Sequence, residues 1–262
     1  MTKQLFNVNS DENRPFGRVL LCNDDGIDAV GLKVLRAIAH SLSDDVWVVA
    51  PTQNHSGASR SITLRRDVEI KEVANQEFSV SGTPADCIIF ALNKILDKKP
   101  DLVLSGVNHG MNVGDDVLYS GTVAAAMEAT LAGIPAIALS QQGGRENRDE
   151  YQVVDAHGAT LIQHLWNNGW PERFIPNVNF PKGAPETIKG MMVASTDQHK
   201  FGDIIEDGAK AGYFRLGPLI SKPDASPGSD RAVIRDGWIA MTPLGMDLTA
   251  YQHISEFEPL TF

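Results

Sequence analysis

Two adjacent carboxylates are the first residues in this sequence whose types suggest chemistry. Asp24 and Asp25 follow a short apolar run, residues 18–23, that has the composition of a buried strand. Neighbouring carboxylates repel each other unless water, hydrogen bonds or a cation offset their charge. A hard cation such as Mg²⁺ binds one or two protein carboxylates and leaves positions open for phosphate oxygens. Because Asp is also common in turns and at helix N-caps, the dipeptide alone fits a metal site and a plain turn equally well.

Two further polar segments carry neutral oxygen atoms that suit the same cation. Ser56 follows a second predicted strand, and Asn108 lies in a glycine-rich segment, residues 106–116, after a third. Ligands of an open parallel sheet bind beyond the carboxyl ends of its strands, so we expect these segments to meet Asp24 and Asp25. An ordinary polar loop and a flexible loop are the competing interpretations of Ser56 and Asn108. The convergence of three loops favours a metal site.

A predicted helix N-terminus follows the glycine-rich segment. Ser120, Gly121 and Thr122 open an alanine-rich helix, whose free N–H groups and dipole attract anions. A simple N-cap is the plainer interpretation of such a tripeptide. Its position directly after the predicted metal loop favours a phosphate site, because hydrolysis of a phosphate ester requires a cation site and an anion site in one crevice.

The order of the predicted elements supplies the frame for these residues. Strands are predicted at 18–23, 46–50, 102–105 and 134–139, and helices at 30–42, 84–96 and 122–131. Such alternation is typical of right-handed βαβ units and of a parallel sheet, which predicts an α/β fold. Residues 68–80 alternate roughly without a long helix, so we expect antiparallel strands at the edge of that sheet.

The rest of the chain is less regular. After about residue 142 a polar loop and a predicted helix at 153–166 lead into short strands interrupted by Pro and Gly. We therefore divide the chain into an N-terminal tail (1–17), a catalytic core (18–180) and a smaller β-rich C-terminal extension (181–262).

Composition and charge exclude several classes of function. The formal net charge of −10 over 262 residues argues against binding to a nucleic-acid duplex, which draws its affinity from Lys and Arg. No stretch approaches the length of a membrane span, so we expect no membrane partner. Cys22 and Cys87 both lie in apolar surroundings, which favours free thiols and a cytoplasmic location. Zinc spacings, a P-loop and a nucleophile elbow are missing from the sequence.

An ordered set of motifs resembles the SurE survival-protein family of nucleotidases. The matching stretches are Asn23-Asp24-Asp25-Gly26, Ala50-Pro51 with Ser56 and Ser61-Ile62-Thr63, Gly82-Thr83-Pro84-Ala85-Asp86-Cys87, Ser105-Gly106-Val107-Asn108 and Asn112-Val113-Gly114-Asp115-Asp116-Val117-Leu118-Tyr119-Ser120-Gly121-Thr122. The match is close over residues 18–139 and weaker at 177–181 and 237–244.

The resemblance implies a Rossmann-like three-layer α/β core, a mostly parallel sheet and a C-terminal extension used to assemble a homodimer or homotetramer. It implies hydrolysis of nucleoside 5′- and 3′-monophosphates. The implied metal ligands are Asp24, Asp25, Ser56 and Asn108, and the implied phosphate contacts are Asn112, Ser120, Gly121 and Thr122.

These observations lead to a mechanistic hypothesis. One divalent ion, Mg²⁺ or Mn²⁺, would offset the charge that develops on the phosphoryl group, and Asp24 or Asp25 would orient or deprotonate the attacking water. A non-catalytic nucleotide or phosphate sensor is the alternative from another class. Action on polyphosphate or other phosphate esters differs only in the substrate.

Overall fold

Strand β1 (Arg18–Cys22) is buried on both faces at the centre of the sheet. Val19 and Leu21 pack into one hydrophobic cluster, and Leu20 and Cys22 pack into another on the opposite face. This explains why the strand is a continuous apolar run rather than an alternating one, since helices cover both faces of a parallel sheet. The computed structural model describes residues 15–144 and 147–256, so most of the predicted tail (1–17) lies outside the described residues.

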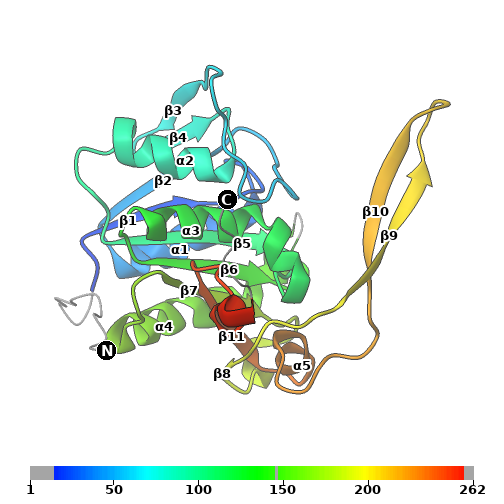
Figure 1. Ribbon diagram of the computed structural model, residues 1–262. Coiled ribbons are helices and arrows are strands. Elements are labelled where there is room, and N and C mark those ends of the chain that lie inside the picture. Colours follow the sequence, from blue (N-terminus) through cyan, green and yellow to red (C-terminus); the bar gives the residue numbers. More distant parts are fainter. Residues whose placement is uncertain (1–14, 145–146, 257–262) are drawn as a thin grey trace.

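Within the described residues, nine strands form one sheet in the order β3-β4-β2-β1-β5-β6-β7-β11-β8 (Figure 1). The remaining members are β2 (Asp45–Pro51), β3 (Ile70–Ala74), β4 (Glu77–Val80), β5 (Leu102–His109), β6 (Ala136–Gln141), β7 (Phe174–Phe180), β8 (Met191–Val193) and β11 (Ile239–Gly245). The run from β4 to β7 is parallel, whereas β3 and β11 are antiparallel to their inner neighbours. The prediction of a mostly parallel sheet with antiparallel strands at residues 68–80 is therefore confirmed.

Helices cover the sheet on both faces and complete a three-layer α/β core. Helices α1 (Val30–Leu42) and α4 (Gln152–Asn168) pack on the face of Val19, and α2 (Pro84–Phe90) and α3 (Gly121–Leu131) pack on the face of Leu20. Short helical turns complete the described chain: η1 (Ala91–Ile95), η2 (Gly114–Tyr119), η3 (Arg148–Tyr151), η4 (Pro185–Thr187), α5 (Asp230–Arg235) and η5 (Tyr251–Glu256). No helix in the described part of the chain is long and apolar enough to cross a membrane.

Two predicted elements differ from the structure in detail. The helix predicted at 84–96 is α-helical only to Phe90 and continues as one π-helical turn, η1. The segment after residue 105, predicted as a loop, begins instead inside β5, which continues to His109 with an irregular register between Ser105 and Asn108. Asn108 therefore pairs with Ser140 of β6 and is positioned by the sheet itself.

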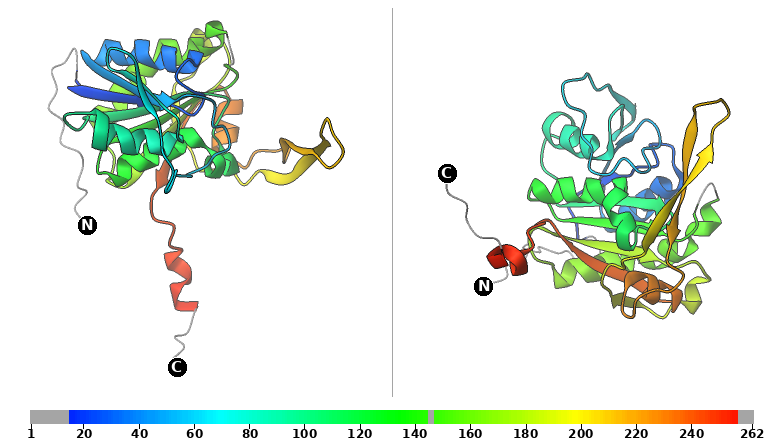
Figure 2. Two further views of the ribbon diagram at one scale, coloured as in Figure 1. Left: turned by 90° about the horizontal axis from the view of Figure 1, so that it is seen from above. Right: turned by 45° about the vertical axis from the view of Figure 1, so that its right-hand side comes forward.

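The C-terminal part of the chain contributes to two separate structures. Strands β8 and β11 extend the main sheet beyond β7. Strands β9 (Lys200–Asp207) and β10 (Phe214–Ser221) form an antiparallel hairpin that projects from the body of the molecule, and η5 projects at another side (Figure 2). The division of the chain at residues 180 and 181 remains a prediction.

Helix α1 begins in close contact with the backbone of β5. A Cβ atom at Gly31 would lie 2.0 Å from the carbonyl oxygen of Val107 and 3.1 Å from Tyr151 Oη. The backbone of Val107 cannot yield in the way that a flexible side chain does. Only glycine therefore lets the first turn of α1 approach the strand that carries Asn108.

We expect Gly31→Ala to destabilise the protein by about 1–3 kcal/mol, the range of overpacking in a core, although alanine is the better helix former. Gly202→Ala is the control, because its Cβ would meet only the side chain of Ile220 at 3.5 Å. Urea denaturation of both variants measures the effect. Equal stability of the two variants would contradict the close packing of α1 against β5.

Candidate functional site

The turn after β1 is closed by the side chain of Asn23. Its Nδ2 donates to the carbonyl oxygen of Gly26 at 2.9 Å, and its Oδ1 accepts from the amide of Gly26 at 3.3 Å. Gly26 has φ +106, a conformation that glycine adopts without strain. The buried Asn23 thus fixes the bend that Asp24 and Asp25 form at the carboxyl end of β1.

Asp24 points toward the start of α3. Its carboxylate is 3% exposed, and its Oδ1 accepts a hydrogen bond of 2.5 Å from Thr122 Oγ1. A Cβ at Gly121 would lie 2.7 Å from the Cβ of Asp24, so glycine is required where the helix begins. Burial raises the pKa of Asp24 from 3.8 to about 6; the Thr122 hydrogen bond opposes the rise and the neighbouring Asp25 charge adds to it. Asp24 is therefore a buried acid for which a nearby positive charge would be favourable.

Asp25 points to the opposite side of the sheet. Its Oδ2 accepts from the backbone amide of His109 at 3.1 Å, and its Oδ1 accepts from Asn54 Nδ2 at 3.1 Å. Burial raises the pKa of Asp25 as well. The two adjacent carboxylates are thus held by different parts of the fold, Asp24 by the start of α3 and Asp25 by His109 and Asn54.

Ser56 lies on an exposed loop that is attached to the Asp24 backbone. The amide of His55 donates to the carbonyl oxygen of Asp24 at 2.8 Å, and the amide of Ser56 donates to Asn54 Oδ1 at 2.7 Å. Asn54 thus contacts both Asp25 and Ser56. The sequence analysis missed Asn54, because an Asn within a polar loop carries no signal beyond turn propensity.

Asn108 lies near the carboxyl end of β5, at the same edge of the sheet as Asp24 and Asp25. Its side chain is mostly buried, and its Nδ2 donates to the carbonyl oxygens of His109 at 3.1 Å and Gly110 at 2.9 Å. This orientation leaves Oδ1 as the amide atom for a ligand. Asp24, Asp25, Ser56 and Asn108 together offer only oxygen donors, the type that Mg²⁺ and Mn²⁺ prefer. The described residues contain no group of three or more His, Cys, Asp or Glu side chains suited to a metal, so any metal here relies on the two carboxylates and neutral oxygens.

Asn112 is bound by residues of β6 and β7 on the face of the sheet that α3 covers. Its Nδ2 donates to Ser140 Oγ at 2.9 Å, and its carbonyl oxygen accepts from Asn177 Nδ2 at 2.8 Å and Asn179 Nδ2 at 3.0 Å. Asn177 and Asn179 are fully buried on one face of β7. In the sequence, two asparagines spaced two residues apart in an otherwise apolar strand indicate that both side chains lie on one face of that strand. This pattern could have predicted the contact with Asn112.

The first turn of α3 is capped by Ser120 and bound to Asp24 through Thr122. Ser120 Oγ accepts a hydrogen bond from the amide of Val123 at 3.0 Å, so Ser120 is the N-cap of the helix. The hydroxyl of Thr122 donates its hydrogen bond to Asp24. The acceptor side of Ser120 Oγ is therefore used within the protein. The backbone of Thr122 also lies against the Asp24 carboxylate, and the positive end of the helix dipole at this turn favours negative charge.

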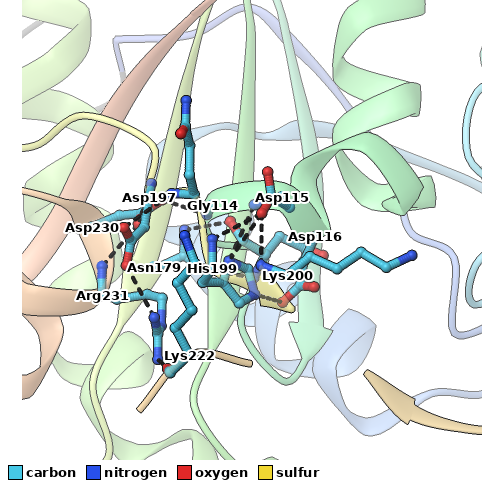
Figure 3. A network of polar contacts seen from close by, with 12 residues as sticks. Gly114, Asp115, Asp116, Asn179, Asp197, His199, Lys200, Lys222, Asp230 and Arg231 are labelled. Atoms are coloured by element: carbon cyan, nitrogen blue, oxygen red, sulfur yellow. Dashed lines mark hydrogen bonds and ion pairs between the residues drawn. The ribbon is translucent and has the colours of Figure 1, made fainter. Parts of the chain in front are cut away.

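A polar network ties the segment before α3 to the base of the β9–β10 hairpin (Figure 3). The amide of Gly114 donates to Asp230 Oδ2 at 2.8 Å, and Asp115 Oδ2 accepts from the amides of His199 and Lys200, both at 2.8 Å. Asp230 is fully buried, and its Oδ1 also accepts from the amide of Asp197 at 3.2 Å. Carboxylates thus satisfy the backbone amides on both sides of this junction.

His199 is the buried ring at the centre of the network (Figure 3). Its Nδ1 accepts from the amide of Asp115 at 3.2 Å, which leaves the ring proton on Nε2, 3.4 Å from Asp116 Oδ2. A Cβ at Gly114 would lie 2.4 Å from Nδ1, so the ring packs directly on the backbone of η2. The sequence analysis assigned no role to His199, because its contacts come from residues more than eighty positions away.

Comparisons with known proteins all point to one family. A family model described as Survival protein SurE matches residues 19–203. A 5′-nucleotidase SurE of Brucella abortus (strain S19) is 47% identical over 243 residues, which cover 90% of this chain and 94% of the relative. A 5′-nucleotidase SurE of Brucella canis matches at the same identity and coverage. A crystal structure of the SurE protein from Aquifex aeolicus matches with a TM-score of 0.80 and 36% identity, and covers 91% of this chain and 97% of that one.

The raised pKa of Asp24 predicts a pH dependence of stability. A carboxyl whose pKa is raised on folding contributes stability at low pH. This contribution is lost as the pH rises through the pKa of the carboxyl in the folded protein, which is about 6 for Asp24. In metal-free buffer with EDTA, Asp24→Asn should therefore gain stability relative to the unsubstituted protein as the pH rises. The gain should grow by about 1 kcal/mol from about pH 5 to about pH 8.

Urea denaturation at both pH values measures this difference. Asp236→Asn, which alters an exposed carboxylate beside Arg235, is the control and should leave the pH dependence unchanged. A difference between Asp24→Asn and the unsubstituted protein that stays constant with pH would contradict the raised pKa.

Proposed function

The chain belongs to the SurE survival-protein family, and on that premise we propose that it is a metal-dependent 5′-nucleotidase. It would hydrolyse nucleoside 5′-monophosphates, and also 3′-monophosphates, to a nucleoside and phosphate. The observation that carries the proposal is the buried Asp24 beside the first turn of α3, since it supports a cation site and an anion site in one crevice.

The residues fit a divalent ion, and each has a separate task. Asp24, Asp25, Ser56 and Asn108 would hold Mg²⁺ or Mn²⁺ through oxygen atoms. When bound, the ion supplies positive charge that stabilises the developing charge of phosphoryl transfer. The raised pKa values of Asp24 and Asp25 support this assignment, because buried neighbouring carboxylates favour a cation.

The protein groups around the ion bind and orient the substrate. The amides of Gly121 and Thr122 and the side chains of Asn112 and Ser120 would hold non-bridging phosphate oxygens. Asp24 or Asp25 would accept a hydrogen bond from the attacking water and direct it toward phosphorus. Asn54, Asn177 and Asn179 would keep these groups in place, because each donates a hydrogen bond to a member of the site.

We expect Asp25→Asn to lower phosphate release from AMP by at least about 10²-fold, because ligands of a catalytic ion supply several kcal/mol of transition-state stabilisation. EDTA should abolish the activity of the unsubstituted enzyme, and Mg²⁺ or Mn²⁺ should restore it. Colorimetric measurement of inorganic phosphate follows the reaction. Asp236→Asn is the matched control, and thermal unfolding shows whether each variant is folded.

The same assay separates the proposal from its alternatives. Binding of AMP without phosphate release under any divalent metal would support a nucleotide sensor and contradict the enzyme. Release of phosphate from polyphosphate or sugar phosphates but not from nucleotides would keep the metal chemistry and change the substrate class.

The hairpin supports a homodimer or homotetramer. Phe201, Ile205, Phe214 and Leu216 are each more than 60% exposed on β9 and β10, although they are large and apolar. A two-stranded hairpin is marginally stable in water when nothing covers it, so we propose that a second copy of the chain packs on this surface. The exposed side chains of Leu248, Tyr251 and Ile254 near η5 offer a second such contact.

We expect Phe214→Asp to shift the protein toward the monomer, because it places a charge in the apolar contact. Sedimentation velocity measures the change in mass. Lys210→Glu, in the hairpin turn, is the control for a change of charge alone. An unchanged mass for Phe214→Asp would exclude this surface from assembly.

The cellular setting is also part of the proposal. Cys22 and Cys87 are both free and buried, which fits a reducing compartment. We therefore propose a cytoplasmic enzyme with a nucleoside monophosphate as substrate and with neither a membrane nor a nucleic-acid duplex as partner.

A further inference from the structure

A cavity of about 380 Å³ opens beside Asp25 on the α1 side of the sheet. Its walls include Asp25, Asp28, Val30, Asn54, His109 and Tyr151. This volume lies within the range of ~300–1,000 Å³ that is typical of small-molecule pockets. The catalytic roles proposed above use Asp25 and Asn54 but leave the rest of the cavity unexplained.

The position of the cavity relative to the phosphate groups follows from the strand register. Asp24 contacts the first turn of α3 through Thr122, whereas Asp25 lines the cavity together with Val30 of α1. Asn112 also lies on the α3 side, because it binds Ser140 and Asn179, which pair across β6 and β7. A phosphate held by α3 and Asn112 would therefore lie on the side of Asp24, and the cavity lies on the side of Asp25.

A substrate whose phosphate lies on the α3 side can thus extend its leaving group past Asp25 into the cavity. This places the phosphate and the alcohol part of the ester on opposite faces of one sheet edge. The cavity involves residues outside the proposed phosphate contacts, since Asp28, Asn54 and Tyr151 belong to none of them.

The chemistry of the walls favours hydroxyl groups over anions. Asp28 is exposed, and no hydrogen bond or ion pair joins its carboxylate to another described residue. Asn54 is already used, because its Nδ2 and Oδ1 bind Asp25 and Ser56. The hydroxyl of Tyr151 is bound to the carbonyl oxygen of Gly144 at 2.5 Å.

Asp28 is therefore an acceptor in the cavity that no described residue already uses. Among its described wall residues there is no Lys or Arg that would accommodate a second phosphate. A phosphate chain in this cavity would face two carboxylates at close range, which is unfavourable.

We propose that this cavity binds the nucleoside part of the substrate and that Asp28 is a specificity-determining residue that accepts hydrogen bonds from the ribose hydroxyls. The inference rests on the proposed nucleotidase function and deepens it. A neutral ribose with two neighbouring hydroxyls is complementary to a single carboxylate, whereas a nucleotide diphosphate would bring a charged leaving group against it.

Steady-state kinetics on AMP and on p-nitrophenyl phosphate tests the role of Asp28, because the second ester has no ribose. We expect Asp28→Ala to raise KM for AMP about tenfold, the effect of losing a hydrogen bond to a charged group, with kcat changed little. KM for p-nitrophenyl phosphate should stay within about twofold of the starting value. Glu72→Ala, which removes an exposed carboxylate from β3, is the control.

Two results would overturn the inference: an unchanged KM for AMP, or an equal rise for both esters. Calorimetric titration with adenosine makes the test independent of turnover. Adenosine should bind the unsubstituted protein more tightly than Asp28→Ala, and 2′,3′-dideoxyadenosine should not distinguish the two.

Equal binding of adenosine to both proteins, or no binding to either, also overturns the inference. If the protein hydrolyses neither ester but binds adenosine through Asp28, the nucleotidase proposal is contradicted and the assignment of the cavity to the nucleoside stands.

Discussion

The burial of Asp24 against the first turn of α3 is the constraint on which the rest of the site depends. A carboxylate with 3% exposure is costly unless hydrogen bonds and positive charge surround it. Thr122 supplies the hydrogen bond, and Gly121 supplies the space, because any side chain at that position would overlap Asp24. The helix N-terminus supplies partial positive charge. The identities of Gly121 and Thr122 at the start of α3 therefore depend on the buried carboxylate of Asp24, which lies just after β1.

The same turn divides the edge of the sheet into two sides. Asp24 contacts the first turn of α3 through Thr122, whereas Asp25 is bound by Asn54 and by the amide of His109. Asn112 and its partners lie with Asp24, whereas Asn54, His109 and the cavity lie with Asp25. The two sides of the edge therefore differ in chemistry, because the start of α3 lies on one side and the carboxylates of Asp25 and Asp28 lie on the other.

The segment that connects these groups to α3 is held from the far end of the chain. Asp230 and His199 bind the backbone of Gly114 and Asp115, and the hairpin begins one residue after His199. An apolar surface exposed on β9 and β10 is thus joined by short buried contacts to the residues that precede Ser120. The hairpin and the segment before α3 thus meet in one buried junction, in which the ring of His199 packs on η2.

The sequence by itself determined the α/β fold, because continuous apolar runs such as residues 18–22 predict strands that are covered on both faces. It also singled out Asp24, Asp25, Ser120 and Thr122, whose neighbours in the chain carry the signal. Only the tertiary structure decided that Thr122 binds Asp24 and that Asn54 joins Asp25 to Ser56. Asn54 and His199 sit in ordinary polar segments, and their partners come from distant parts of the chain. The physical reason is that strand periodicity and helix caps are local properties, whereas the partner of a buried polar atom is set by which loops the folded sheet brings together.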